Sequence, residues 1–191
     1  KSSGIDTKKY ILKDKFNDRL KVLFASRLLK DKGVLEFIEL AKSLNNNNFE
    51  FFIAGDLDPG NPSSLNSDEL NEIKKLDFVD YLGFIDIENE LHNYDVFVSL
   101  SVQEGFSRTL LESSFVGLFV LGLENNGTKF ISELDNSKLI TNLKIENFQK
   151  ELKKLDSMDL SLSLKNQDII RSQYSSNAVA NKFKNIYEIL N

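Results

Sequence analysis

The sequence of 191 residues has no cysteine and a single histidine, His92. The lack of cysteine excludes a disulfide and a thiol nucleophile, and one histidine is too few for a Cys/His zinc cluster. No apolar run approaches the roughly 18 residues of a membrane-spanning helix. There is also no excess of basic charge, because 24 Lys and Arg stand against 29 Asp and Glu, for a net charge of −5. We therefore expect no nucleic-acid partner. No secretory signal is evident, and we expect a cytoplasmic location.

The hydrophobic content of 41%, with 15 phenylalanines, indicates a packed globule of one domain. The first residue is Lys1 and the only methionine is Met158, so we expect a fragment of a longer protein. Residues 1–20 are polar and lack a sustained period, which predicts a linker. Residues 21–191 are expected to form a single domain.

Short apolar runs alternate with helical patterns along the chain, which predicts an α/β fold. The expected class is a doubly wound, parallel six-stranded sheet, Rossmann-like, with helices on both faces. The strands are expected at residues 21–26, 49–54, 79–82, 95–100, 118–122 and 137–140. Helices are expected over 34–44, ended by the Asn run 45–48, over 67–76, around 88–94, from 107 to about 117, and in three stretches after 144, the last at 177–190.

In a sheet of order 3-2-1-4-5-6, the ligand crevice lies between the loops that follow strands one and four. The first loop carries Arg27 and Lys32, and the second carries residues 104–107. The two cations can clamp a diphosphate through their side chains. No Gly-x-Gly-x-x-Gly follows strand one, which counts against a nicotinamide or flavin cofactor.

The loop after the fourth strand leads into a helix at Ser107, a good N-cap, and Gly105 lets the backbone bend or approach a ligand. The next three amides, of Arg108, Thr109 and Leu110, have no partner within the helix and favour a phosphate.

Two carboxylates, Glu104 and Glu112, flank this loop. Carboxylates repel phosphate and accept hydrogen bonds from hydroxyl groups, including both hydroxyls of a vicinal diol. Amides and acids together therefore predict a ligand that is both phosphorylated and polyhydroxylated, such as a nucleotide sugar.

The order Glu104-Gly-Phe106, then Leu111-Glu112, with seven residues between the acids, resembles the Glu-x(7)-Glu signature of retaining nucleotide-sugar glycosyltransferases, most closely family 4. This resemblance implies the C-terminal, donor-binding domain of a B-type enzyme with two Rossmann domains. It also implies that Glu112 holds the ribose, while Glu104, with the backbone of Gly105 and Phe106, lies at the donor sugar and phosphate.

Other segments match the same family in the same order, across about residues 3–187. Arg27-Leu28 and Lys32-Gly33 resemble its diphosphate-binding element, with Ser26 in place of a glycine. Leu82-Gly83-Phe84 is similar to the segment near the nucleobase. One departure is Phe130, which stands where members usually have a glutamate.

The resemblance implies a metal-independent transferase of the hexosyltransferase type that uses a UDP-sugar or GDP-sugar and needs no cofactor. It implies an acceptor glycan or glycolipid bound by an N-terminal half, peripheral association with the inner face of the membrane, and a role in surface polysaccharide or glycolipid synthesis. The isolated domain is expected to be inactive. The expected catalytic residues are Glu104, Arg27 and Lys32. The expected donor-binding residues are Gly105, Phe106, Ser107, Thr109, Leu110, Glu112, Gly83 and Phe84.

Alternative interpretations remain open. The chain can be a non-catalytic nucleotide-binding or interaction module of the same fold, or a sugar-nucleotide epimerase, although an epimerase needs further acids and histidines. Asp56-Leu57-Asp58 has the Asp-x-Asp pattern that binds metal in another glycosyltransferase architecture, but we expect a turn away from the crevice. Lys150, Lys153 and Lys154 are expected on a solvated helix face, with a membrane-surface role as the alternative.

Overall fold

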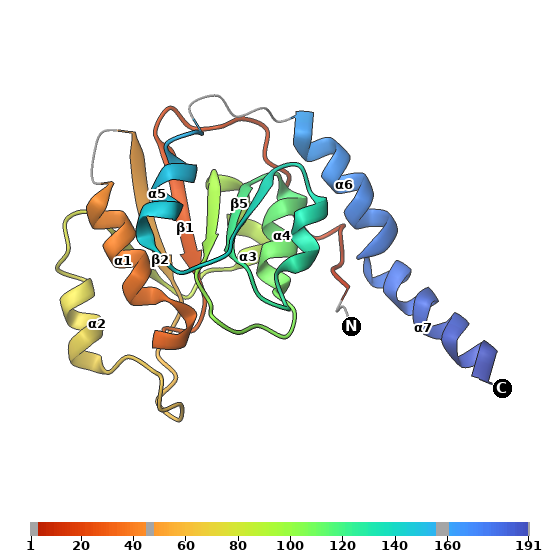
Figure 1. Ribbon diagram of the computed structural model, residues 1–191, viewed down its shortest axis with the longest axis horizontal. Helices are drawn as coiled ribbons and strands as arrows, with labels where there is room; N and C mark the ends of the chain where they lie inside the picture. The colour runs from red at the N-terminus through yellow and green to blue at the C-terminus, as the bar shows by residue number, and fades with distance from the viewer. Residues whose placement is uncertain (1–3, 45–47, 156–160, 191) are drawn as a thin grey trace.

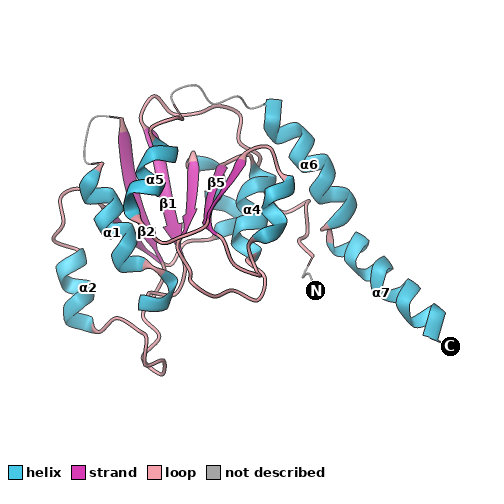
Figure 2. Cartoon of the chain, viewed as in Figure 1, coloured by secondary structure: helices cyan, strands magenta, loops and turns pink. Residues whose placement is uncertain are grey.

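A computed structural model describes residues 4–44, 48–155 and 161–190. Its centre is a six-stranded sheet of order β3-β2-β1-β4-β5-β6 in which every neighbouring pair is parallel (Figures 1 and 2). The strands are β1 (Leu20–Ala25), β2 (Phe49–Ala54), β3 (Asp80–Gly83), β4 (Val96–Ser99), β5 (Phe119–Leu123) and β6 (Ser137–Ile140). Strand order reverses between β1 and β4, where the crevice is expected.

Helices connect consecutive strands and continue the chain after the sheet. The α-helices are α1 (Val34–Ser43), α2 (Ser67–Ile73), α3 (Ile87–Glu90), α4 (Arg108–Val116), α5 (Ile145–Leu152), α6 (Ser161–Gln173) and α7 (Ser176–Leu190). The 3₁₀ turns are η1 (Lys30–Lys32), η2 (Leu91–Asn93) and η3 (Lys129–Glu133).

The sheet is buried on both faces because successive side chains of each strand point to opposite sides. In β1, Val22 and Phe24 belong to the core beneath α1, α2 and α5, whereas Leu23 belongs to the core that includes residues of α4 and α6. In β4, Val98 belongs to the core beneath α1, α2 and α5, and Phe97 belongs to the core on the α4 side. This arrangement confirms the predicted doubly wound α/β class and the predicted strand order.

The predicted elements match the observed ones to within a few residues. The ranges predicted for β2 and β6 coincide with the observed strands, and α2 is the main shortfall, since it ends at Ile73 rather than at residue 76. The stop expected at residues 45–48 falls, except for Asn48, outside the described residues.

The described part of the N-terminal segment packs onto the domain. Ile5 is fully buried and forms a parallel bridge with Ser175, at the junction of α6 and α7. Lys13 forms a buried ion pair with Asp95, at 2.8 Å, just before β4. Ile5 and Tyr10 therefore join the core on the α4 side of the sheet, and the role of the segment as a linker stays a prediction.

The last helix, α7, runs away from the sheet beyond α6 (Figure 1). On this helix Val179 is buried, whereas Phe183, Ile186 and Tyr187 are half exposed or more. None of the described helices has the length and apolar character needed to cross a membrane.

Candidate functional site

The loops after β1 and β4 meet at the carboxyl ends of the central strands. Lys32 Nζ lies 2.8 Å from Glu104 Oε1 and 3.4 Å from Ser101 Oγ. The side chains of Lys32 and Glu104 are 19% and 21% exposed, so this ion pair is partly shielded from water. They line a small cleft of about 100 Å³ together with Ser107 and Thr109.

Lys32 is positioned by the backbone on either side of it. It ends the short turn η1, and Gly33 follows with φ +82°, a left-handed conformation that glycine adopts without strain. A side chain at Gly33 would also collide with the Leu100 side chain at the end of β4. Gly33 therefore brings the lysine close to the β4 loop and begins α1.

A third loop, after β5, braces the β4 loop from the other side. Asn125 Nδ2 donates to Ser101 O at 2.9 Å, and Ser107 N donates to Gly127 O at 3.0 Å. A Cβ at Gly127 would lie 2.5 Å from Glu104 O, so only glycine permits this approach. Nothing in the residue types of this loop indicates that it supports Glu104.

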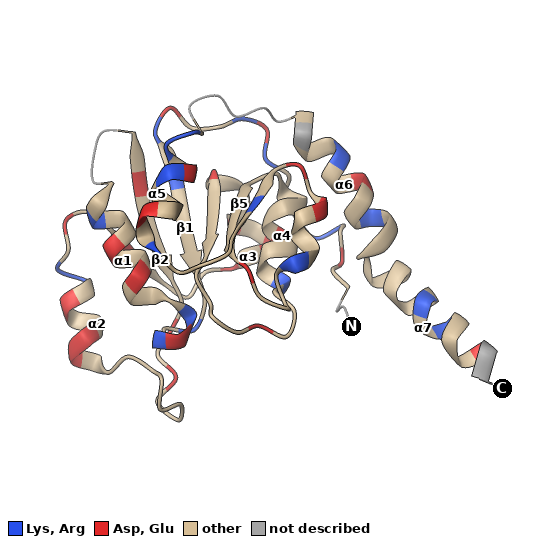
Figure 3. Cartoon of the chain, viewed as in Figure 1, with Lys and Arg blue, Asp and Glu red and all other residues tan. Residues whose placement is uncertain are grey.

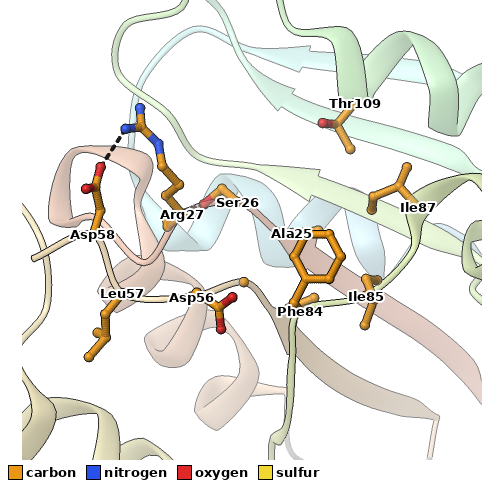
Figure 4. A pocket seen from close by; sticks show the side chains of 12 residues that line it. Ala25, Ser26, Arg27, Asp56, Leu57, Asp58, Phe84, Ile85, Ile87 and Thr109 are labelled. Atoms are coloured by element: carbon orange, nitrogen blue, oxygen red, sulfur yellow. Dashed lines mark hydrogen bonds and ion pairs between the residues drawn. The ribbon is translucent and has the colours of Figure 1, made fainter.

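A larger cleft of about 590 Å³ adjoins the first, a size typical of small-molecule sites. Arg27 lies on one wall, and Phe84, Ile85 and Ile87 lie on the opposite wall (Figure 4). The Phe84 ring is 79% exposed and follows Gly83, whose φ is +70°. The floor includes the backbone at the ends of β1 and β2.

The prediction that Asp56 and Asp58 lie away from the crevice was wrong, because both line this cleft. Asp58 Oδ2 is 2.6 Å from Arg27 Nη1, while Asp56 points away from the guanidinium (Figure 4). The β2 loop curls back toward β1, where Leu28 N donates to Asp56 O at 2.9 Å. This backbone contact has no signature in the residue types. Within the described ranges, no three acids or histidines group as a metal site.

Helix α4 begins between the two clefts. Ser107 is its N-cap residue as predicted, although its side chain makes no capping hydrogen bond. Thr109, in the first turn, lines both clefts. Leu110 is fully buried in the core, its backbone included, and it lines neither cleft. Gly105 is exposed in the preceding loop.

Glu112 lies one turn further along α4 and is only 6% exposed. Its Oε1 accepts two hydrogen bonds of 2.7 Å, one from the Tyr10 hydroxyl and one from Arg108 Nε. Burial and the hydrogen bond to Glu112 raise the pKa of Tyr10, so its hydroxyl stays protonated and acts as the donor. The Tyr10 contact links residues that are distant in the chain, so the sequence did not predict it.

Phe106 packs in an aromatic cluster rather than against the clefts. Its ring stacks on Phe130 with centroids 4.6 Å apart, and Tyr174 lies 5.7 Å from Phe130. Phe130, which stands where a glutamate is usual in the resembling family, thus serves apolar packing here. Phe106 is partly buried and packs against the core on the α4 side of the sheet.

Charge around these clefts is mixed, and acidic and basic residues are interspersed along the whole chain (Figure 3). Both cations predicted to bind phosphate are paired with acids of the chain itself, Arg27 with Asp58 and Lys32 with Glu104. An incoming anion must compete with these carboxylates. The basic side chains of residues 150, 153 and 154 are exposed at the end of α5.

Solved structures share this fold, a Rossmann-like parallel sheet with helices on both faces. Sucrose-phosphate synthase from Thermosynechococcus elongatus aligns with a TM-score of 0.82 and 16% identity, over 98% of this chain and 51% of that one. Anabaena HepE in complex with UDP and glucose aligns with a TM-score of 0.77 and 19% identity, over 95% of this chain and 55% of that one. At these identities, the likeness concerns the fold alone.

Residues 7–174 match the family described as glycosyl transferases group 1, and the chain belongs to this family. A relative from Campylobacter jejuni, N,N'-diacetylbacillosaminyl-diphospho-undecaprenol alpha-1,3-N-acetylgalactosaminyltransferase, is 31% identical over 173 residues. The alignment covers 87% of this chain and 44% of the relative. The chain thus spans about half the length of the proteins that it matches.

Proposed function

We propose that this chain is the donor-binding, C-terminal half of a retaining glycosyltransferase that uses a nucleotide-diphosphate sugar. The observation that carries the proposal is the 2.8 Å contact between Lys32 and Glu104. It brings a cation from the β1 loop and an acid from the β4 loop to one cleft, at the switch point of the sheet. Such a pair can bind both parts of the donor, because the cation can contact the phosphates and the carboxylate can accept hydrogen bonds from the sugar hydroxyls.

The proposed catalytic role of Arg27 and Lys32 is to neutralise the diphosphate as charge develops on the leaving group. Both side chains line clefts that meet at Thr109. Glu104, with the backbone of Gly105 and Phe106, would position the donor sugar. The first amides of α4, near Ser107, would add anion stabilisation.

The larger cleft would hold the nucleoside of a UDP-sugar or GDP-sugar. Its apolar wall at Phe84, which follows Gly83, suits a base. Glu112, which is not among the residues that line this cleft, would accept from the ribose hydroxyls. Phosphate neutralisation by two side chains makes the proposed reaction metal-independent and free of other cofactors. In a retaining reaction, leaving group and acceptor would occupy the same face of the sugar.

The acceptor is proposed to be a glycan or glycolipid bound by an N-terminal half outside this chain. Support comes from the Campylobacter relative, whose name describes transfer of N-acetylgalactosamine to a saccharide on diphospho-undecaprenol. We accordingly propose a hexosyltransferase-type enzyme of surface polysaccharide or glycolipid synthesis. It would work in the cytoplasm at the inner face of the membrane, where it would associate peripherally.

Calorimetry with UDP, GDP and their sugars tests donor binding by the 191-residue chain. We expect binding of one nucleotide class, with an affinity that falls at least tenfold in Arg27→Ala/Lys32→Ala, since each cation would lose a charge-assisted contact of about 1.5 kcal/mol or more. Lys30→Ala is the matched control, because Lys30 pairs with Glu69 at 2.8 Å outside the clefts. Equal or undetectable binding by wild type and the double variant would refute the proposal.

A non-catalytic nucleotide sensor of the same fold is the second candidate. Phe130 favours it, because its ring packs against Phe106 and offers no polar group to a sugar. The full-length protein should consume donor, and Glu104→Ala should abolish that consumption if the chain is an enzyme. Nucleotide binding without any donor consumption would favour the sensor. The isolated chain is expected to bind donor and turn over little.

A further inference from the structure

The carboxylate of Glu112 is held asymmetrically. Both hydrogen bonds that it accepts, from Tyr10 and from Arg108, end on the same oxygen, Oε1. A carboxylate oxygen has about two lone-pair positions, so Oε1 is saturated. Its other oxygen, Oε2, has no hydrogen-bond partner among the described residues. It does not belong to the fully buried side-chain atoms that lack a partner.

We propose that Tyr10 is a positioning residue for Glu112, and that Tyr10 and Arg108 together fix one carboxylate oxygen so that the other faces the ribose diol of the nucleotide. The inference rests on the proposed function, because it assigns the ribose to Glu112. Two lone pairs on Oε2 can accept from both hydroxyls of a vicinal diol. Free rotation of the carboxylate would otherwise carry an entropic cost on binding.

The surroundings of Tyr10 support a rigid arrangement. Its ring is buried and packs edge-on against Phe115 of α4, with centroids 6.0 Å apart. Its hydroxyl reaches Glu112 from a segment 102 residues earlier in the chain. Because Glu112 is 6% exposed, the two donors also compensate for the removal of its charge from water.

The location of Glu112 also fits a ribose between base and diphosphate. Glu112 itself lines neither cleft, but Thr109, which lines both, precedes it by three residues on α4, and residues at that spacing share a helix face. The base would lie toward Phe84 on one side, and the phosphates toward Lys32 on the other.

The test measures how strongly the 191-residue chain prefers ribonucleotides to deoxynucleotides. Calorimetry would compare UDP and GDP with their 2′-deoxy and 3′-deoxy analogues, for wild type, Tyr10→Phe, Arg108→Gln and Glu112→Ala. Wild type should prefer the ribonucleotide, and Glu112→Ala should remove that preference. Tyr10→Phe should reduce the preference roughly three- to tenfold, the scale of coupling between contacting residues. The deoxy analogues should bind wild type and Tyr10→Phe equally.

Two controls separate positioning from general stability. Tyr94→Phe removes the hydroxyl of another buried tyrosine, whose ring packs on Phe52 at 5.4 Å, and should leave the preference unchanged. In a Glu112→Ala background, Tyr10→Phe should have no further effect on affinity. Arg108 is 52% exposed on the helix surface, so Arg108→Gln gives a readout even if Tyr10→Phe folds poorly.

An unchanged ribose preference in both Tyr10→Phe and Arg108→Gln would overturn the inference. So would equal weakening of ribonucleotides and deoxynucleotides by Tyr10→Phe, or a wild type that binds nucleotide without preferring ribose. These results leave the proposed donor binding intact. Failure of wild type to bind either UDP or GDP would instead refute the proposed function.

Discussion

Lys32 Nζ and Glu104 Oε1, 2.8 Å apart, form an ion pair that joins the loops after β1 and β4. In this arrangement the carboxylate of Glu104 pairs with the ammonium of Lys32, which would otherwise be free to bind a phosphate. A diphosphate must therefore replace a carboxylate of the protein itself as the partner of Lys32. The same contact keeps the acid close to where a sugar would follow the phosphates.

Glu104→Gln should tighten the binding of UDP or GDP because it frees Lys32 from an internal anion. The gain should be roughly two- to fivefold, since ion pairs with some solvent access contribute up to about 1 kcal/mol. The preference for the sugar nucleotide over the nucleoside diphosphate should shrink in parallel. Calorimetry with both ligands checks this, and weaker diphosphate binding would contradict the competition.

Asp58→Asn should likewise strengthen diphosphate binding by releasing Arg27, which lies 2.6 Å from Asp58. The expected change is about two- to threefold, because the pair is exposed and worth little in water. Asp135→Asn is a matched control, since it breaks a surface pair with Lys165 of the same length far from β1 in sequence. A tighter complex in both variants would point to net charge rather than to Arg27.

Sequence patterns predicted the sheet well because its strands are short apolar runs with helices between them. This alternation requires a parallel sheet, and the rules for connections then leave few possible strand orders. The meeting of Lys32 with Glu104 was predictable for the same reason, since the switch point fixes which two loops face each other. Lys32 stands seven residues after the end of β1, and Glu104 stands five residues after the end of β4.

Contacts made by the β2 loop, the β5 loop and the N-terminal segment were not predictable. Tyr10 reaches Glu112 only because residues 4–19 fold back over α4, and Asp58 reaches Arg27 because a proline- and glycine-containing loop curls toward β1. Neither path is dictated by periodicity. Phe130 was evident as a departure, but its stacking on Phe106 depends on the tertiary fold.

Donor binding is expected to be independent of divalent metal. Affinity for the nucleoside diphosphate should agree within about twofold between buffer with EDTA and buffer with Mg²⁺, because Arg27 and Lys32 would supply the positive charge. Calorimetry in the two buffers measures this. A loss of binding in EDTA that Mg²⁺ restores would show that a cation completes the site.

Asp95→Ala should destabilise the domain by about 3–5 kcal/mol, because it leaves the buried ammonium of Lys13 unpaired. Asp95 is fully buried and also accepts from Lys21 N at 2.7 Å and from Asn17 N at 3.1 Å. Glu72→Ala, which removes an exposed pair with Lys75, should cost less than about 1 kcal/mol. Urea denaturation compares the two, and similar losses would mean that the N-terminal segment contributes little.

Gly127→Ala should impair the site by forcing the backbone of the β5 loop away from Glu104. The added Cβ would lie 2.5 Å from Glu104 O, so the β4 and β5 loops must separate. We expect a loss of about 1–3 kcal/mol in unfolding free energy, the range for overpacking, together with weaker nucleotide binding.

The matched variant is Gly60→Ala, because a Cβ at Gly60 meets nothing within 4 Å. It should change stability by no more than about 0.5 kcal/mol, as surface substitutions do. Urea denaturation and nucleotide calorimetry on both variants provide the comparison. If Gly127→Ala kept full stability and affinity, the bracing of Glu104 by the β5 loop would have no role in the site. A selective loss in Gly127→Ala would mean that the position of Glu104 depends on a loop that does not itself touch Lys32.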